Sequence, residues 1–237
     1  MKEIFIKDKL EKIGVNITDI VLGDFDQIGE FTAKKNRSPD KDLYKKAGCF
    51  FRPNYERGIL MYHLVKNSNL KTVLEIGFGR GYSTFCMAKA MCDNNISGEI
   101  TTVDPNFNKD FLNQLYNIFP KEWFEKINFV QSTAEEFYNK NLDKKYDFIY
   151  IDGDHRYEAV KKDWDFAKDH FDKFVLFDDY HMPTKQQKDI ECSKLIDEIN
   201  GFEKELIIMD RRIFYDDRRV PDDKIDYGQV LLTKEAV

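Results

Sequence analysis

One apolar run ends in an acidic residue and leads into three alternating glycines. Residues 73–84 read Val-Leu-Glu-Ile-Gly-Phe-Gly-Arg-Gly-Tyr-Ser-Thr. The apolar part predicts a buried strand over residues 72–76, and the part after the glycines predicts a helix over residues 82–92. Glycines at such a turn let the backbone approach a ligand closely. The spacing E-x-G-x-G-x-G differs from the G-x-G-x-x-G of dinucleotide-binding proteins.

Short apolar strands alternate with helical segments through the rest of the chain. This alternation is typical of a mostly parallel sheet covered by helices on both faces. No helical pattern is visible over residues 210–228, so the last two strands are expected to form an antiparallel pair at one edge. The sequence therefore predicts a seven-stranded, Rossmann-like α/β fold. The expected strands are 72–76, 99–103, 127–130, 146–151, 174–177, 205–209 and 229–233, and the helices between the first five are 82–92, 109–118, 133–140 and 157–170.

The first 54 residues lack this alternation. They contain a polar loop at residues 36–42 and short amphipathic segments at 9–13 and 43–47. We expect residues 1–54 to form a helical extension over the core, and residues 55–237 to form one domain that begins with a helix.

Composition and charge exclude several classes of protein. The 237 residues carry a net charge of −6, with both signs interspersed, which gives no electrostatic basis for binding nucleic acid. The N-terminus is charged where a signal peptide needs an apolar core, and no apolar stretch is long enough to span a membrane. Four scattered cysteines without a C-x-x-C pair argue against a zinc site and a disulfide framework. We expect a cytoplasmic protein.

The glycine-rich segment resembles the first motif of class I S-adenosylmethionine (SAM) methyltransferases. The resemblance implies SAM as cofactor and a sheet that closes with an antiparallel pair. It also implies that the motif and the start of the following helix bind the cofactor, through Glu75, Gly77, Gly79, Gly81, Tyr82 and Ser83.

An acidic residue, Asp104, follows the second expected strand. Ligands of open α/β sheets bind beyond the carboxyl ends of the strands, where such a carboxylate can accept hydrogen bonds from two ribose hydroxyls. The alternative is that Asp104 only begins the turn into Pro105, because Asp-Pro is a common turn signal. With the glycine motif upstream, we favour the ribose role.

The third expected strand leads into a helix start. Ser132 or Thr133 can cap this helix, with Glu135 or Glu136 in its first turn, and capping alone explains these residues. In the SAM enzymes that the motif resembles, the same loop lines the adenine pocket. The resemblance thus implies that Thr133 and Ala134 contact the cofactor.

Three carboxylates are expected at the ends of the fourth and fifth strands. Asp152 follows the fourth strand, and Asp178 and Asp179 follow the fifth after one crossover helix. Neighbouring strands lie roughly 4.8 Å apart, so the three side chains should converge beside the cofactor. Their mutual repulsion would be relieved by a divalent cation, and all-oxygen ligation suits Mg²⁺, Mn²⁺ or Ca²⁺. The alternative is that each Asp only caps a helix.

The residues around these carboxylates resemble metal-dependent O-methyltransferases. Asp152-Gly-Asp-His-Arg-Tyr, followed by a strand that ends in Asp178-Asp179-Tyr, is similar to enzymes that methylate sugar hydroxyls of macrolides, and more distantly to catechol O-methyltransferase. The resemblance implies that the first Asp and the later pair bind Mg²⁺, that Asp152 also contacts the cofactor, and that His155 is the base. Catechol-type enzymes carry Lys at the base position and Asn at the last ligand. His181 is the rival base.

We therefore expect a SAM-dependent and metal-dependent O-methyltransferase. Its acceptor would be a hydroxyl of a small molecule with vicinal oxygens, such as a sugar or a natural product. The alternatives are a metal-independent SAM methyltransferase acting on nitrogen or oxygen, a non-catalytic nucleotide-binding module and an NAD-linked enzyme. We expect neither nucleic acid nor membrane as a partner, and the extension suits a homo-oligomer.

Overall fold

The structure, a computed structural model, describes residues 1–23, 25, 28, 55–181, 190–210 and 227–234. Its strands are β1 (Lys2–Phe5), β2 (Thr72–Ile76), β3 (Glu99–Val103), β4 (Ile127–Val130), β5 (Tyr146–Ile151), β6 (Phe171–His181), β7 (Phe202–Ile208) and β8 (Tyr227–Lys234). Its helices are α1 (Ile6–Lys12), the 3-10 helix η1 (Ile17–Asp19), α4 (Tyr55–Asn67), α5 (Tyr82–Asp93), α6 (Lys109–Tyr116), α7 (Lys121–Phe124), α8 (Ala134–Lys140), α9 (Tyr157–His170) and α10 (Cys192–Glu198). Every predicted strand and helix of the domain falls on one of these elements.

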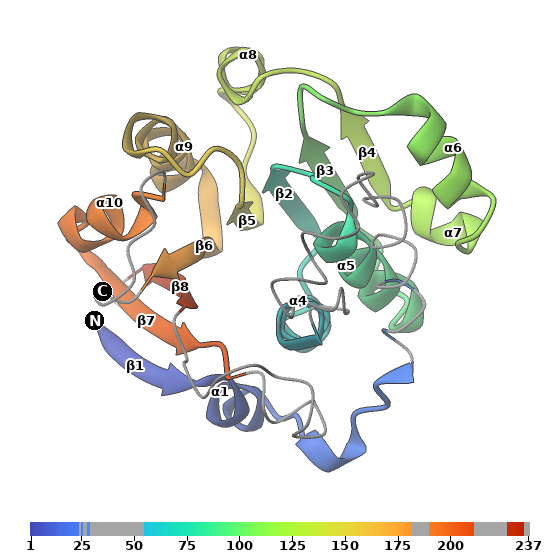
Figure 1. Ribbon diagram of the computed structural model, residues 1–237, viewed down its shortest axis with the longest axis horizontal. Helices are drawn as coiled ribbons and strands as arrows, with labels where there is room; N and C mark the ends of the chain where they lie inside the picture. Colours follow the sequence, from blue (N-terminus) through green and yellow to red (C-terminus); the bar gives the residue numbers. More distant parts are fainter. Residues whose placement is uncertain (24, 26–27, 29–54, 182–189, 211–226, 235–237) are drawn as a thin grey trace, which may run out of the picture.

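The strands form one sheet in the order β1-β7-β8-β6-β5-β2-β3-β4 (Figure 1). Only β8 runs antiparallel to its neighbours, β6 and β7, whereas all other described pairs are parallel. The predicted Rossmann-like, mostly parallel fold with an antiparallel pair is therefore confirmed. None of the described helices is long and apolar enough to cross a membrane.

An eighth strand corrects the prediction of seven. The first residues of the chain form β1, which pairs in parallel with β7, so the antiparallel pair of β7 and β8 is not at the edge. Helix α1 follows directly, and the buried ammonium of Lys9 forms an ion pair with Glu205 of β7, which Lys12 also contacts at 2.8 Å. The start of the chain is thus part of the sheet and not only a helical cover. The expected segment 43–47 lies outside the described residues.

The sheet is buried on both faces because its strands are apolar on both sides. In β5, Phe148 and Tyr150 belong to the core on one face, and Ile149 and Ile151 belong to the core on the other. Helices α4 and α5 cover the first face, and α8, α9 and α10 cover the second (Figure 1). Alternating side chains of a parallel strand point to opposite faces, which explains the near-continuous apolar runs.

The register of the parallel strands brings the candidate site residues together. Ile76 pairs with Val103 on one side and with Ile151 on the other, and Ile151 pairs with Phe177. The residue that follows each of these four therefore lies in one row across the carboxyl ends of the strands. This row consists of Gly77, Asp104, Asp152 and Asp178.

Candidate functional site

The three glycines of the turn meet different surroundings. A Cβ at Gly77, where φ is +94°, would lie 2.1 Å from the backbone oxygen of Asp152. A Cβ at Gly81, where φ is +81°, would lie 2.5 Å from the ring of Phe78. Gly79 also has a positive φ of +52°, but a Cβ there would have no neighbour within 4 Å. Two glycines are thus needed for close packing, and Gly79 faces open space.

This open space belongs to a cavity of about 1020 Å³ beyond the carboxyl ends of β2, β3 and β5. Such a volume is enough for a nucleoside-sized ligand. Six of the predicted cofactor residues line it, namely Gly77, Gly79, Asp104, Thr133, Ala134 and Asp152. The other four, Glu75, Gly81, Tyr82 and Ser83, are not among its described lining residues. The cavity lies where the ligands of open α/β sheets bind, beyond the carboxyl ends of the strands.

Asp104 braces the glycine turn from the cavity wall. Its Oδ2 accepts hydrogen bonds from the backbone N–H groups of Phe78 and Gly79, each at 3.2 Å. Its Oδ1 accepts one from the backbone N–H of Asn106 at 2.7 Å, which is a turn of the kind expected before a proline. The turn role is therefore present, and the side chain also borders the space where a ribose would lie.

Thr133 is the N-cap of α8. Its hydroxyl accepts a hydrogen bond from the backbone N–H of Glu136 at 3.2 Å, and the Glu136 carboxylate accepts one from the backbone N–H of Thr133 at 3.1 Å. This reciprocal capping box confirms the capping interpretation for Thr133. The same residue and Ala134 line the cavity, so capping and cofactor contact are compatible.

Glu75 has an internal role in this structure. Its carboxyl group is buried and accepts hydrogen bonds from the hydroxyls of Thr84 on α5 and Thr102 on β3, the latter at 2.7 Å. Burial raises the pKa of Glu75 to about 7. The side chain thus joins β2 to β3 and α5 behind the cavity.

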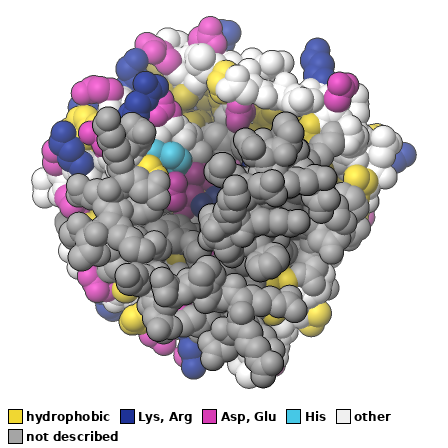
Figure 2. All heavy atoms as spheres, viewed as in Figure 1, with side chains coloured by type: hydrophobic (Ala, Val, Ile, Leu, Met, Phe, Trp, Pro, Cys, Tyr) yellow, Lys and Arg dark blue, Asp and Glu magenta, His cyan; other side chains and the backbone are white. Residues whose placement is uncertain are grey.

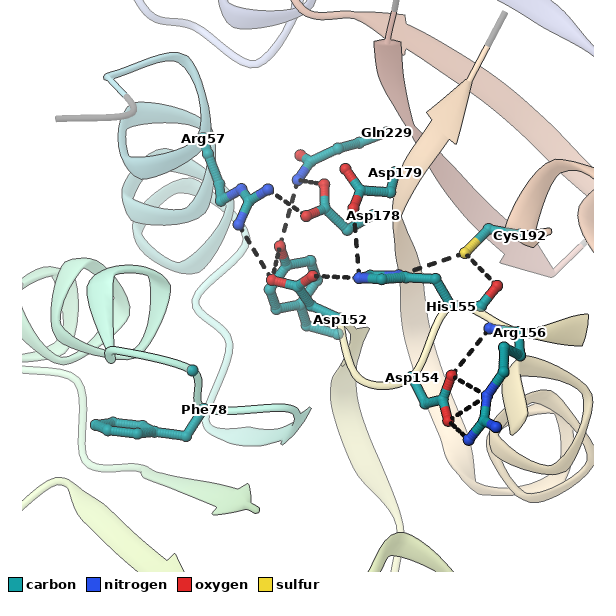
Figure 3. Close-up of polar contacts among 12 residues, drawn as sticks. Arg57, Phe78, Asp152, Asp154, His155, Arg156, Asp178, Asp179, Cys192 and Gln229 are labelled. Carbon is teal, nitrogen blue, oxygen red and sulfur yellow. Dashed lines mark hydrogen bonds and ion pairs between the residues drawn. The ribbon is translucent and has the colours of Figure 1, made fainter. Parts of the chain in front are cut away.

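Asp152 links two parts of the site. Its Oδ2 accepts hydrogen bonds from Tyr150 and from Nη1 of Arg57, both at 3.1 Å, whereas its Oδ1 lies 4.0 Å from Nε2 of His155 (Figure 3). Loss of hydration and the neighbouring carboxylate of Asp178 raise the pKa of Asp152. One oxygen therefore faces Arg57, and the other faces the histidine.

Asp178 is enclosed by polar partners. Its side chain is fully buried, forms an ion pair with Nη2 of Arg57 and accepts a hydrogen bond from Nε2 of Gln229 at 2.8 Å. Burial raises the pKa of Asp178, but the Arg57 guanidinium and hydrogen bonds with Asp152 and Gln229 outweigh this effect and hold the pKa below its usual value. Asp178 is thus a buried anion with a protein cation as its partner.

Asp179 is directed toward His155 by an irregularity of β6. The register between β6 and β8 shifts between Phe177 and Tyr180, and Asp179 has a left-handed φ of +52°. Such bulges redirect side chains beside functional sites. Nε2 of His155 lies 3.3 Å from Oδ2 of Asp179, and its Nδ1 lies 3.5 Å from Sγ of Cys192. The side chain of the rival base, at position 181, is outside the described residues.

The predicted metal ligands lie at one rim of the sheet, with Asp152 and Asp178 on the same Arg57 guanidinium. In the part of the chain that the structure describes, the only three acidic, His or Cys residues able to share an ion are Asp152, His155 and Asp179, whose ligand atoms lie within 4.8 Å of one another. Asp178 is instead bound to Arg57, so the set Asp152, Asp178 and Asp179 does not fit a shared metal in this arrangement. Magnesium stays a prediction of the sequence.

Sequence reasoning missed four residues of the site: Arg57, Tyr150, Cys192 and Gln229. Gln229 carried a signal, because a polar residue within the apolar strand 229–233 needs a buried partner. Arg57 carried none, because a single charged residue near the start of a helix most often lies in solvent. Figure 2 shows a histidine, acidic side chains and a basic side chain together in a hollow of one face.

Comparisons with known proteins agree with this geometry. Residues 74–180 match a family described as a methyltransferase domain. The whole chain is similar in structure to a Klebsiella pneumoniae protein assigned as an O-methyltransferase (TM-score 0.60, 13% identity, 97% of this chain and 96% of the other covered). It is also similar to a Bacillus cereus O-methyltransferase in complex with SAH, the demethylated product of SAM (0.56, 12%, 90% and 100%).

A third similar structure is the O-methyltransferase TomG from Streptomyces achromogenes, involved in tomaymycin synthesis and solved with SAM (0.54, 12%, 91% and 99%). At these identities the structural likeness shows the fold, and the family match shows what kind of domain residues 74–180 form. The predicted fold is thus confirmed for the chain, and residues 74–180 match a methyltransferase domain as predicted.

Proposed function

We propose that this class I methyltransferase transfers a methyl group from SAM to a hydroxyl oxygen of a small molecule. The observation that carries the proposal is the cavity itself. Its lining includes Gly79, Asp104, Thr133 and Asp152, and Oδ1 of Asp152 lies 4.0 Å from Nε2 of His155. A cofactor in this cavity would place its reactive end near the only described cluster of carboxylates and histidine that could serve a reaction.

Residues of the wall would hold the cofactor in a defined way. Gly77 and Gly79 let the backbone approach it, and Asp104 would accept hydrogen bonds from the ribose hydroxyls. Thr133 and Ala134 would border the adenine. In this role the Asp104 carboxylate keeps the glycine turn in place by accepting hydrogen bonds from its backbone N–H groups. The carboxylate has further lone pairs that can accept hydrogen bonds from the ligand.

Methyl transfer needs an aligned oxygen and an acceptor for its proton. SAM supplies an electrophilic methyl group, and the acceptor oxygen bonds to it as the sulfur–methyl bond breaks and SAH forms. We propose that His155 receives the hydroxyl proton and that Asp179, whose Oδ2 lies 3.3 Å from Nε2, orients the ring. Holding the two reacting groups in line can itself contribute roughly 7–11 kcal/mol.

A sugar or natural product with vicinal oxygens remains the proposed acceptor. The support is the resemblance to macrolide-sugar enzymes and the acidic character of the wall, with Asp152, Asp154 and Glu191, which suits a neutral or cationic acceptor better than an anionic one. A cytoplasmic location, a homo-oligomeric state, and the lack of nucleic-acid and membrane partners stay predictions.

A metal-independent reaction is the second candidate, and the ion pair between Arg57 and Asp178 favours it. A divalent cation bound to Asp152, Asp178 and Asp179 stays the prediction of the sequence. Methyl transfer to a panel of sugars, diols and catechols, with and without EDTA, separates the two candidates. Activity that survives EDTA supports the second, and activity that EDTA abolishes and Mg²⁺ restores supports the first.

The cofactor is tested by calorimetric titration of the full chain with SAH and with NADH. We expect SAH to bind and NADH not to bind. Asp104→Asn should weaken SAH binding about tenfold, because one charge-assisted hydrogen bond contributes about 1.5 kcal/mol. The matched control is Asp110→Asn on α6, away from the cavity. Binding of NADH without binding of SAH would refute the proposed function.

A further inference from the structure

Arg57 occupies a central position in the acidic cluster. It is the third residue of α4, and its guanidinium reaches two neighbouring strand ends (Figure 3). Nη1 donates to Oδ2 of Asp152 at 3.1 Å, and Nη2 pairs with Oδ2 of Asp178. A planar guanidinium carries several donors in fixed directions, so one arginine can bind two carboxylates at the same time.

Burial makes this pairing important for stability. The side chain of Asp178 is 0% exposed, that of Asp152 is 19% exposed and that of Arg57 is 21% exposed. Neighbouring carboxylates that are shielded from water repel each other, and removing their cation is strongly destabilising. Gln229 donates to the other oxygen of Asp178 at 2.8 Å, so both oxygens of this carboxylate have a protein partner.

We propose that Arg57 is the resident cation of this site: its guanidinium takes the place between Asp152 and Asp178 that a divalent metal would otherwise fill. Arg57 thereby withdraws Asp178 from metal coordination. It also fixes Asp152 through Oδ2, so that Oδ1 faces His155 and Asp179. Arg57 is a positioning residue, and it makes the shape of the site independent of added metal. The pairing of Arg57 with the two carboxylates does not depend on the proposed function. Only the statement that the resulting arrangement serves methyl transfer rests on it.

The test is metal binding and thermal unfolding of the full chain, with Mn²⁺ as the probe. We expect the wild type to show the same Tm in EDTA and in Mn²⁺, and no stoichiometric Mn²⁺ signal by calorimetry or electron paramagnetic resonance. Arg57→Gln should lower Tm in EDTA by about 10 °C and should create one Mn²⁺ site that restores most of the loss.

Two further variants separate charge from geometry. Adding Asp178→Asn to Arg57→Gln should recover part of the Tm without metal and abolish the new Mn²⁺ site, because the unpaired anion is gone. Arg57→Lys keeps the positive charge and should therefore not bind Mn²⁺. The matched control is Arg156→Gln, which breaks an exposed pair with Asp154 and should create no Mn²⁺ site. If Arg57→Gln does not fold, Mn²⁺ binding by the wild type and by Arg57→Lys still tests the inference.

Three results would overturn the inference. One is stoichiometric Mn²⁺ binding by the wild type. Another is Arg57→Gln with a wild-type Tm and no Mn²⁺ site. The third is Mn²⁺ binding by Arg57→Lys. A parallel SAH titration separates the two proposals. If the wild type fails to bind SAH while Arg57→Gln gains the metal site, the proposed function fails and the role of Arg57 stands.

Discussion

Replacing Glu75 by Gln tests whether this motif residue acts inside the protein or on the cofactor. The carboxyl group is buried and accepts two threonine hydroxyl hydrogen bonds, and burial raises its pKa from 4.5 to about 7. A glutamine has the same shape, and its carbonyl oxygen can accept the same two hydrogen bonds. The substitution therefore removes the ionisation and leaves the packing.

The magnitude follows from the pKa difference between the folded and the unfolded chain. A raised pKa means that the folded state holds its proton more tightly, so this contribution is complete below pH 4.5 and is lost as pH rises through about 7. The full loss amounts to about 3 kcal/mol, of which about 2.5 kcal/mol falls between pH 5 and pH 8. The glutamine variant has no such loss.

Urea unfolding of the wild type and Glu75→Gln across this pH range measures the effect. We expect the stability of the variant relative to the wild type to rise by about 2.5 kcal/mol from pH 5 to pH 8 and then to level off. Glu125→Gln, an exposed carboxylate on the surface, is the control and should give parallel curves. SAH affinity should stay at the wild-type value. Parallel curves for Glu75→Gln, or a large loss of SAH affinity, would refute the internal role.

Two further predictions concern the turn and the N-terminal strand. Gly77→Ala should lower the free energy of unfolding by about 3 kcal/mol, because it adds strain at a positive φ and a clash with the backbone of Asp152. Gly79→Ala places its methyl group in open space, so it should cost less stability. The same variant should weaken SAH binding in calorimetry. Glu205→Gln should cost about 3 kcal/mol in urea unfolding, because the buried ammonium of Lys9 loses its counter-charge. Adding Lys9→Met should recover much of that loss, and an equal loss in the double variant would contradict this explanation.

The amino-acid sequence by itself determined the parallel sheet, the glycine turn and the placement of Asp104, Asp152 and His155 at its rim. These features depend on local patterns: apolar runs of strand length, turn residues after them, and the rule that successive parallel strands end at the same edge. The register then aligns the residues that follow the strands, so that their convergence could be expected from the chain alone.

Only the tertiary structure decided which charges meet. Strand β1 has no pattern of its own and is formed by pairing with a strand some two hundred positions later in the chain. Glu75 precedes the glycine turn in sequence, yet the strand carries its side chain to two threonines behind the cavity. The ion pairs of Arg57 join three distant elements, α4, β5 and β6. Such pairings follow from long-range packing, and neither spacing nor composition encodes which cation reaches a buried carboxylate.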